Sequence, residues 1–177
     1  MIRSPNSCIR EEKESLLIVG EGKREEVFLK YVNDVYSCRN GTVFDIKNGS
    51  GGSPETIINR AKNIALDGEY KDVIAVIDSD KLTEEAENLA RSEDVELIVN
   101  KPCLEGLFLQ IKEKRGKPYS KYKNCKKEFN DEYLRSGEID FDIESCKRIF
   151  PKNELDKMCK KIIQLNKIVN IIKRGEL

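Results

Sequence analysis

Short apolar runs alternate with helical patterns four times between residues 16 and 111, and this alternation constrains the fold more than any other feature. Such a run without polar alternation is typical of a strand buried on both faces, as in a parallel sheet. A segment with apolar residues at helical spacing follows each run. The pattern predicts an α/β fold with a mostly parallel, Rossmann-like sheet and helices on both faces. The expected strands cover residues 16–19, 42–46, 73–77 and 95–99, and the expected helices cover residues 24–37, 54–67, 83–92 and 104–111.

The two ends of the chain differ from this central region. Residues 1–14 are polar and irregular and are expected to form a lead-in to a core at 15–111. Residues 112–177 are expected to form a basic helical extension packed on that core. Within it, residues 153–172 carry an amphipathic pattern that predicts one long helix. Packing of its apolar stripe on the core is favoured, and a homodimer interface is the alternative.

The charges are unevenly distributed along the chain. Thirty-two basic and thirty-two acidic side chains give a formal net charge of zero, which by itself argues against a strongly basic nucleic-acid-binding protein. Residues 1–111 carry fourteen basic and twenty-one acidic side chains, whereas residues 112–177 carry eighteen basic and eleven acidic ones. This split predicts an acidic site beside a surface for the phosphates of DNA or RNA, with an ordinary solvated surface as the alternative. The lysines expected to contact nucleic acid are Lys117, Lys121, Lys123, Lys126 and Lys127.

The chain has no histidine, which excludes Ser-His-Asp and Cys-His catalysis and histidine metal ligands. Its six cysteines form no Cys-x-x-Cys pair, so a structural zinc site or a secreted disulfide framework is disfavoured. We expect no signal peptide and no membrane span, and therefore a cytoplasmic protein with reduced thiols. A metal ion is expected to be held by oxygen ligands.

Acidic residues follow three of the four expected strands. Glu21 follows the first strand, Asp78 and Asp80 end the third, and Glu105 lies in the first turn of the helix after the fourth. Functional groups gather at the carboxyl ends of parallel strands. Carboxylates brought together there repel one another unless a cation lies among them, and Mg²⁺ or Mn²⁺ suits such ligands. The simpler alternatives are a turn or helix cap at Asp-x-Asp and a favourable helix N-terminal charge at Glu105.

Other phosphate-binding patterns fit the sequence poorly. The glycine-rich segment 49–52 lacks the Lys-Ser/Thr of a P-loop, and Gly20-Glu21-Gly22 lacks the third glycine of a dinucleotide fingerprint. A flexible loop is the favoured interpretation of 49–52, and backbone N–H groups for a phosphate are the alternative. Haloacid-dehalogenase-type phosphatases also use Asp-x-Asp, but after the first strand and with Thr or Val two residues on. Here the motif follows the third expected strand, and position 82 is Leu.

The acidic motifs occur in an order that resembles the Toprim fold of topoisomerases, bacterial primases and OLD-type nucleases. An apolar strand ends in Glu-Gly at residues 16–22, and a later strand ends in Asp-x-Asp at residues 73–80. More narrowly, the chain resembles RloB-like Toprim proteins of prokaryotic defence loci. Their Pro-Cys-aromatic-Glu motif has a counterpart in Pro102-Cys103-Leu104-Glu105, with leucine in place of the aromatic residue. The histidine common on the following helix is absent, and Gln110 lies in that region.

The resemblance implies a Toprim-like fold and a Mg²⁺- or Mn²⁺-dependent endonuclease of antiviral defence, often encoded beside an ATPase. It implies catalytic roles for Glu21, Asp78 and Asp80, which would also be metal ligands with Glu105 and Glu26. The charge pattern alone predicts that Glu25 and Glu26 are solvated helix residues, with a role beside the metal as the alternative. A Toprim-like module that binds nucleic acid or a partner without cutting it is the alternative function, which the missing histidine favours.

Overall fold

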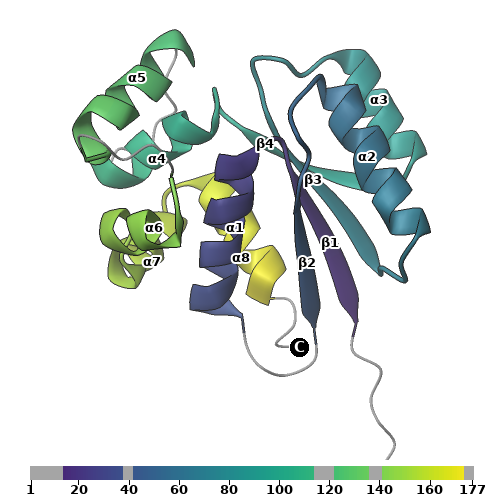
Figure 1. The fold of residues 1–177 in the computed structure, drawn as a ribbon, viewed down its shortest axis with the longest axis horizontal. Coiled ribbons are helices and arrows are strands. Elements are labelled where there is room, and N and C mark those ends of the chain that lie inside the picture. The colour runs from purple at the N-terminus through teal and green to yellow at the C-terminus, as the bar shows by residue number, and fades with distance from the viewer. Residues whose placement is uncertain (1–13, 38–41, 114–121, 136–140, 174–177) are drawn as a thin grey trace, which may run out of the picture.

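Four parallel strands form the central sheet of the computed structural model, which describes residues 14–37, 42–113, 122–135 and 141–173 (Figure 1). The strand order is β2-β1-β3-β4, and every neighbouring pair is parallel. This arrangement confirms the predicted α/β fold. Each strand lies within two residues of its predicted position: β1 is Ser15–Gly20, β2 is Val43–Asn48, β3 is Asp72–Asp78 and β4 is Val95–Asn100.

Helices cover both faces of the sheet, as the apolar runs predict. Figure 1 shows α2 (Pro54–Leu66) and α3 (Glu84–Ser92) on one face, and α1 (Lys23–Tyr36) and α8 (Ile163–Lys173) on the other. Alternate residues of β1 divide between the two layers. Leu17 packs with the α2–α3 side and Ile18 with the α1–α8 side, so both faces of the strand are buried.

Two helix starts follow the side-chain chemistry of their caps. Ser53 is the N-cap of α2, its hydroxyl accepts a hydrogen bond from the backbone N–H of Thr56, and Pro54 is the first helical residue, as predicted. Thr83 caps α3 in the same way, because its hydroxyl accepts from the N–H of Ala86 at 3.1 Å. These caps fix where the loops after β2 and β3 end.

Aromatic side chains join the C-terminal helices to the α1 side of the sheet. Phe108 of α4 (Leu104–Glu113) has its ring centroid 4.9 Å from that of Phe28, 5.0 Å from that of Phe129 and 4.8 Å from that of Phe150. Phe129 belongs to α5 (Tyr122–Tyr133), and Phe150 follows α6 (Ile143–Ile149). The helices on both sides of residue 111 therefore share one hydrophobic core.

The expectation of one long helix at 153–172 is wrong. The segment forms two helices, α7 (Lys152–Cys159) and α8, and the backbone N–H groups of Lys161 and Ile162 both donate to the carbonyl of Met158 at the break. The turn lets α7 contact α4 while α8 contacts α1 and β4, which one straight helix cannot do. It also leaves Ile163, expected in the buried stripe, 82% exposed, whereas most of the stripe is buried in the chain's own core.

None of the helices in the described ranges is both long enough and apolar enough to span a bilayer.

Candidate active site

The carboxyl ends of β1 and β3 lie side by side at the point where the strand order reverses. The chain leaves β1 toward β2 on one side and later enters β3 on the other, and such a switch point is where open α/β sheets bind ligands. Glu21 follows β1, and its backbone N–H donates to the carbonyl of Val76 in β3 at 3.0 Å. Asp78 ends β3, and Asp80 follows in the turn. The predicted strand-end residues are therefore neighbours at one edge.

Asp78 is the most strongly perturbed carboxyl group at this edge. It is only 6% exposed, and its Oδ1 accepts a hydrogen bond from the backbone N–H of Leu104 at 3.0 Å. Burial raises the pKa of Asp78 to about 8, and the negative charges of Glu25, Glu21 and Glu105 add to the increase. With this pKa, the carboxyl group is mostly protonated at neutral pH. A carboxyl held in this way marks a candidate functional site.

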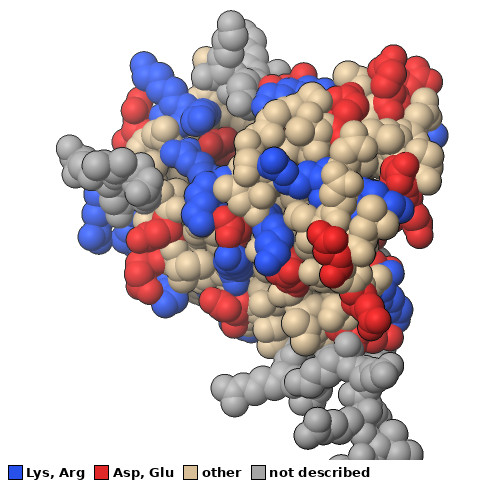
Figure 2. Space-filling model, turned by 45° about the vertical axis from the view of Figure 1, so that its right-hand side comes forward, with Lys and Arg blue, Asp and Glu red and all other residues tan. Residues whose placement is uncertain are grey.

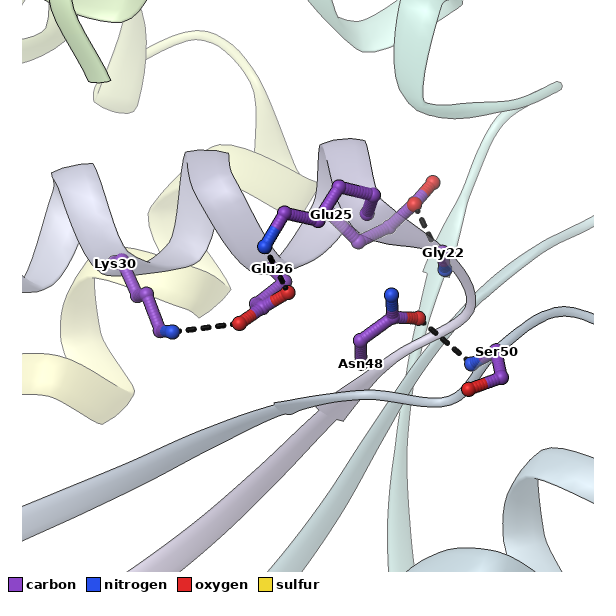
Figure 3. Close-up of polar contacts among 7 residues, drawn as sticks. Gly22, Glu25, Glu26, Lys30, Asn48 and Ser50 are labelled. Carbon is purple, nitrogen blue, oxygen red and sulfur yellow. Dashed lines mark hydrogen bonds and ion pairs between the residues drawn. The ribbon is translucent and has the colours of Figure 1, made fainter. Parts of the chain in front are cut away.

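Glu25 and Glu26 are both buried, so the expectation that they are solvated is wrong. Figure 3 shows that their side chains contact different partners. The Glu25 carboxylate accepts from the N–H of Gly22 at 3.0 Å, and burial raises its pKa, helped by the charges of Glu105 and Glu21. The Glu26 carboxylate pairs with Lys30 at 2.6 Å and Lys23 at 2.9 Å, and the hydrogen bond from Lys30 lowers its pKa.

Glu25, rather than Glu26, is therefore the α1 residue that belongs with the acidic cluster, which we define as Glu21, Glu25, Asp78, Asp80 and Glu105. Gly20 explains how α1 approaches so closely: a Cβ atom there would lie 2.5 Å from the Cβ of Glu25. The glycine at the end of β1, five residues before Glu25, was the available sequence signal for this close approach. Spacing alone did not show which of the two adjacent glutamates faces the cluster, since their side chains differ only by a 100° rotation about the helix axis.

Two cations neutralise part of the acidic cluster, and sequence reasoning assigned neither. Lys81, directly after Asp80, forms an ion pair with Glu21. Arg24 pairs with Glu105 at 2.7 Å and also donates to Oδ1 of Asn130 in α5 at 3.0 Å. Asp80 itself is exposed; partial burial raises its pKa, and the charge of Lys81 opposes the rise.

The loop after β2 holds the backbone of Glu21 in place. Gly49 donates its N–H to the carbonyl of Gly20 at 2.7 Å, and Gly51 donates to the carbonyl of Glu21 at 2.8 Å. Ser50, Gly51 and Gly52 all have positive φ, and the Ser50 N–H donates to Oδ1 of Asn48 (Figure 3). The glycine-rich segment therefore supports the residue that follows β1.

The donor chemistry of the acidic cluster fits a divalent cation, because carboxylate oxygens are the ligands that Mg²⁺ and Mn²⁺ prefer. Glu21, Asp78 and Asp80 are the residues that would hold it, beside Glu25 and Glu105. Among the residues that the structure describes, no three Asp, Glu or Cys side chains are arranged to hold a metal ion. Glu21 would have to leave Lys81 to become a ligand, and Glu26 is occupied by its two lysines.

A fully buried amide lies next to the acidic cluster. Asn100 ends β4 opposite Asp78, and neither its Oδ1 nor its Nδ2 has a hydrogen-bond partner in the described part of the chain. Gln110, also buried, donates from Nε2 to the carbonyl of Lys101 at 3.2 Å and so ties α4 to the turn that follows β4.

The lysines expected to contact nucleic acid are only partly covered by the structure. Lys126 and Lys127 are exposed on α5, which packs against α4. Lys117 and Lys121 lie outside the described residues, as does the side chain of Lys123. The face in Figure 2 shows basic and acidic side chains interspersed, so the division of charge along the sequence does not become two separate surfaces there.

Comparison with protein families gives a match over most of the chain. The model of the family described as RloB-like protein matches residues 16–170, which include β2, β3, β4, all of β1 except Ser15, and the acidic cluster. No curated protein matches the chain, and no solved structure matches it.

Proposed function

Because the chain belongs to the RloB-like family, we propose that it is a metal-dependent nuclease that cleaves phosphodiester bonds in nucleic acid, with a role in prokaryotic anti-phage defence. The observation that carries the proposal is the buried carboxyl group of Asp78 among four further carboxylates at the switch point of the sheet. Burying an ionisable carboxyl group among other carboxylates lowers the stability of the fold, and such perturbed groups cluster at functional sites.

The roles of the residues follow from their charges and positions. Glu21, Asp78 and Asp80 would hold Mg²⁺ or Mn²⁺, with Glu105 and Glu25 beside them. The bound ion would lower the pKa of a bound water molecule and would place a positive charge beside the phosphoryl oxygens. Lys81 and Arg24 add positive charge next to these carboxylates, which favours the approach of a phosphodiester. Lys126 and Lys127 are exposed on the adjoining helix and would contact the phosphate backbone.

Cleavage assays with the purified full chain test the proposal. Labelled single- and double-stranded DNA and RNA are incubated with Mg²⁺, with Mn²⁺ or with EDTA, for wild type and Asp78→Asn. The variant retains an oxygen for the Leu104 N–H, so loss of activity reports the charge rather than the fold. Asp72→Asn is the matched control, since Asp72 lies at the opposite end of the same strand. Absence of metal-dependent cleavage, or equal cleavage by Asp78→Asn, would contradict the proposal.

A non-catalytic module that binds nucleic acid or a partner is the second candidate. Glu21 and Glu105 are already bound to cationic side chains, and this observation favours a site that needs no metal. The module would bind nucleic acid equally well in EDTA and in Mg²⁺, and it would not cleave even when an ATPase encoded beside it is supplied. Binding assays run beside the cleavage assays separate the two functions.

A further inference from the structure

Asn100 points to the same side of the sheet as Asp78. In the parallel pairing of β3 and β4, Val76 lies opposite Ile98 and Asp78 lies opposite Asn100. Val76 and Ile98 both belong to the core on the α1 side, and side chains two residues apart on a strand share a face. The amide of Asn100 and the carboxyl of Asp78 are therefore neighbours on the α1 side, at the carboxyl edge of the sheet.

Among the residues that the structure describes, no group forms a hydrogen bond with the Asn100 side chain. The residue is completely buried, yet its amide oxygen and nitrogen are both without a hydrogen-bond partner among the described residues. The backbone is satisfied independently, since the carbonyl of Asn100 accepts from the N–H of Ser79 at 2.9 Å. A leucine of similar volume would pack there without leaving polar atoms unpaired, so a buried amide without a partner lowers the stability of the fold.

The surroundings of Asn100 indicate what its amide would bind. Asp78 lies directly beside it, and the charges of Glu25, Glu21 and Glu105 act on Asp78. The two cations nearby, Lys81 and Arg24, are each engaged with a carboxylate. The local charge is thus negative, which attracts a cation, and an amide oxygen is a hard ligand of the kind that Mg²⁺ and Mn²⁺ accept.

We propose that the side-chain oxygen of Asn100 is a ligand of the divalent cation that Asp78 binds. This inference rests on the proposed metal site and adds to it a neutral ligand from β4, a strand that otherwise contributes no side chain to the acidic cluster. The site then draws on the ends of three adjacent strands, β1, β3 and β4, rather than two.

The experiment measures Mn²⁺ binding to the purified full chain by electron paramagnetic resonance of free Mn²⁺, together with thermal unfolding in EDTA. Asn100→Leu is expected to weaken Mn²⁺ binding about tenfold or more, without lowering the unfolding temperature in EDTA. Asn100→Asp restores an oxygen ligand and is expected to keep Mn²⁺ binding, which provides a second test if the leucine variant folds poorly. Asn33→Leu is the matched control, because Asn33 on α1 also has a buried amide oxygen without a partner among the residues described, but it adjoins Lys30 and Asp34 rather than the acidic cluster.

The outcomes separate this inference from the proposed function. Unchanged Mn²⁺ affinity in Asn100→Leu would overturn the inference alone, and so would a loss of stability in EDTA, which would assign Asn100 a structural role. A wild type that binds no Mn²⁺ would overturn both proposals. Weaker Mn²⁺ binding in Asn100→Leu, in a protein that cleaves no nucleic acid, would support the inference and contradict the nuclease function.

Discussion

Replacing Asp78 by asparagine is expected to stabilise the metal-free protein. Burial and neighbouring carboxylates raise the pKa of Asp78 from 3.8 to about 8. At pH 7 the Asp78 carboxyl group is therefore mostly protonated in the folded protein but ionised in the unfolded chain, whose pKa lies about three units below pH 7. Each unit of this difference corresponds to about 1.4 kcal/mol. Asparagine is neutral in both states and retains an oxygen for the Leu104 N–H. The substitution should raise the free energy of unfolding at pH 7 by up to about 4 kcal/mol.

The pH dependence of this stability difference shows whether the ionisation of Asp78 causes it. Because the folded-state pKa of Asp78 lies above the unfolded value, the stability contributed by its neutral form is complete below about pH 4 and is lost as the pH rises toward 8. The difference between Asp78→Asn and wild type should thus be about 1.5 kcal/mol at pH 5 and grow steadily to pH 8.

Urea unfolding in EDTA at pH 5, 6, 7 and 8 measures this difference for both proteins, with Asp72→Asn as the control at the other end of β3. The control should show no comparable gain, because Asp72 is partly exposed. Addition of Mn²⁺ should stabilise wild type and leave Asp78→Asn unchanged. A difference that is constant from pH 5 to 8, or a variant less stable than wild type at pH 7, would refute the reasoning.

Three further substitutions probe how the site is supported, each by urea unfolding. Gly20→Ala should cost about 1–3 kcal/mol, because the new Cβ would lie 2.5 Å from the Cβ of Glu25; unchanged stability would refute the close approach. Arg24→Met should cost about 2 kcal/mol by leaving Glu105 buried without its partner, and adding Glu105→Gln should recover most of that loss. Phe108→Ala should cost about 3–5 kcal/mol, since four aromatic rings surround it; a loss below 1 kcal/mol would contradict its central position.

The sheet could be predicted from the sequence because burial on both faces leaves a direct signal. Strands such as β3 carry an unbroken apolar run, and the helices between them carry apolar residues at helical spacing. The C-terminal region could not be predicted in the same way. Its periodicity indicates which residues are apolar, but the break after Cys159 depends on the positions of α4, α1 and β4, which are distant in sequence.

The location of the candidate site was predictable, but the state of its side chains was not. Residues at the carboxyl ends of parallel strands must share an edge, so Glu21 and Asp78 were expected together. The pairing of Glu105 with Arg24 joins α4 to α1 across much of the chain, and no local pattern reports it. The missing hydrogen-bond partner of the Asn100 amide, within the part of the chain that the structure describes, likewise follows from packing, because it depends on the groups that surround the end of β4.

Several unfavourable features occur together at one edge of the sheet, and this coincidence is an argument for function that is independent of the family match. Asp78 is a buried carboxyl group with a raised pKa, Asn100 is a buried amide without a hydrogen-bond partner in the described ranges, and Ser50 has a positive φ in the loop that supports Glu21. Each lowers the stability of the folded protein, and each could be removed by a single substitution. Proteins keep such destabilising features together at sites where a bound ligand offsets their cost. A divalent cation offsets the first two, since it favours the ionised carboxylate and gives the amide oxygen a partner.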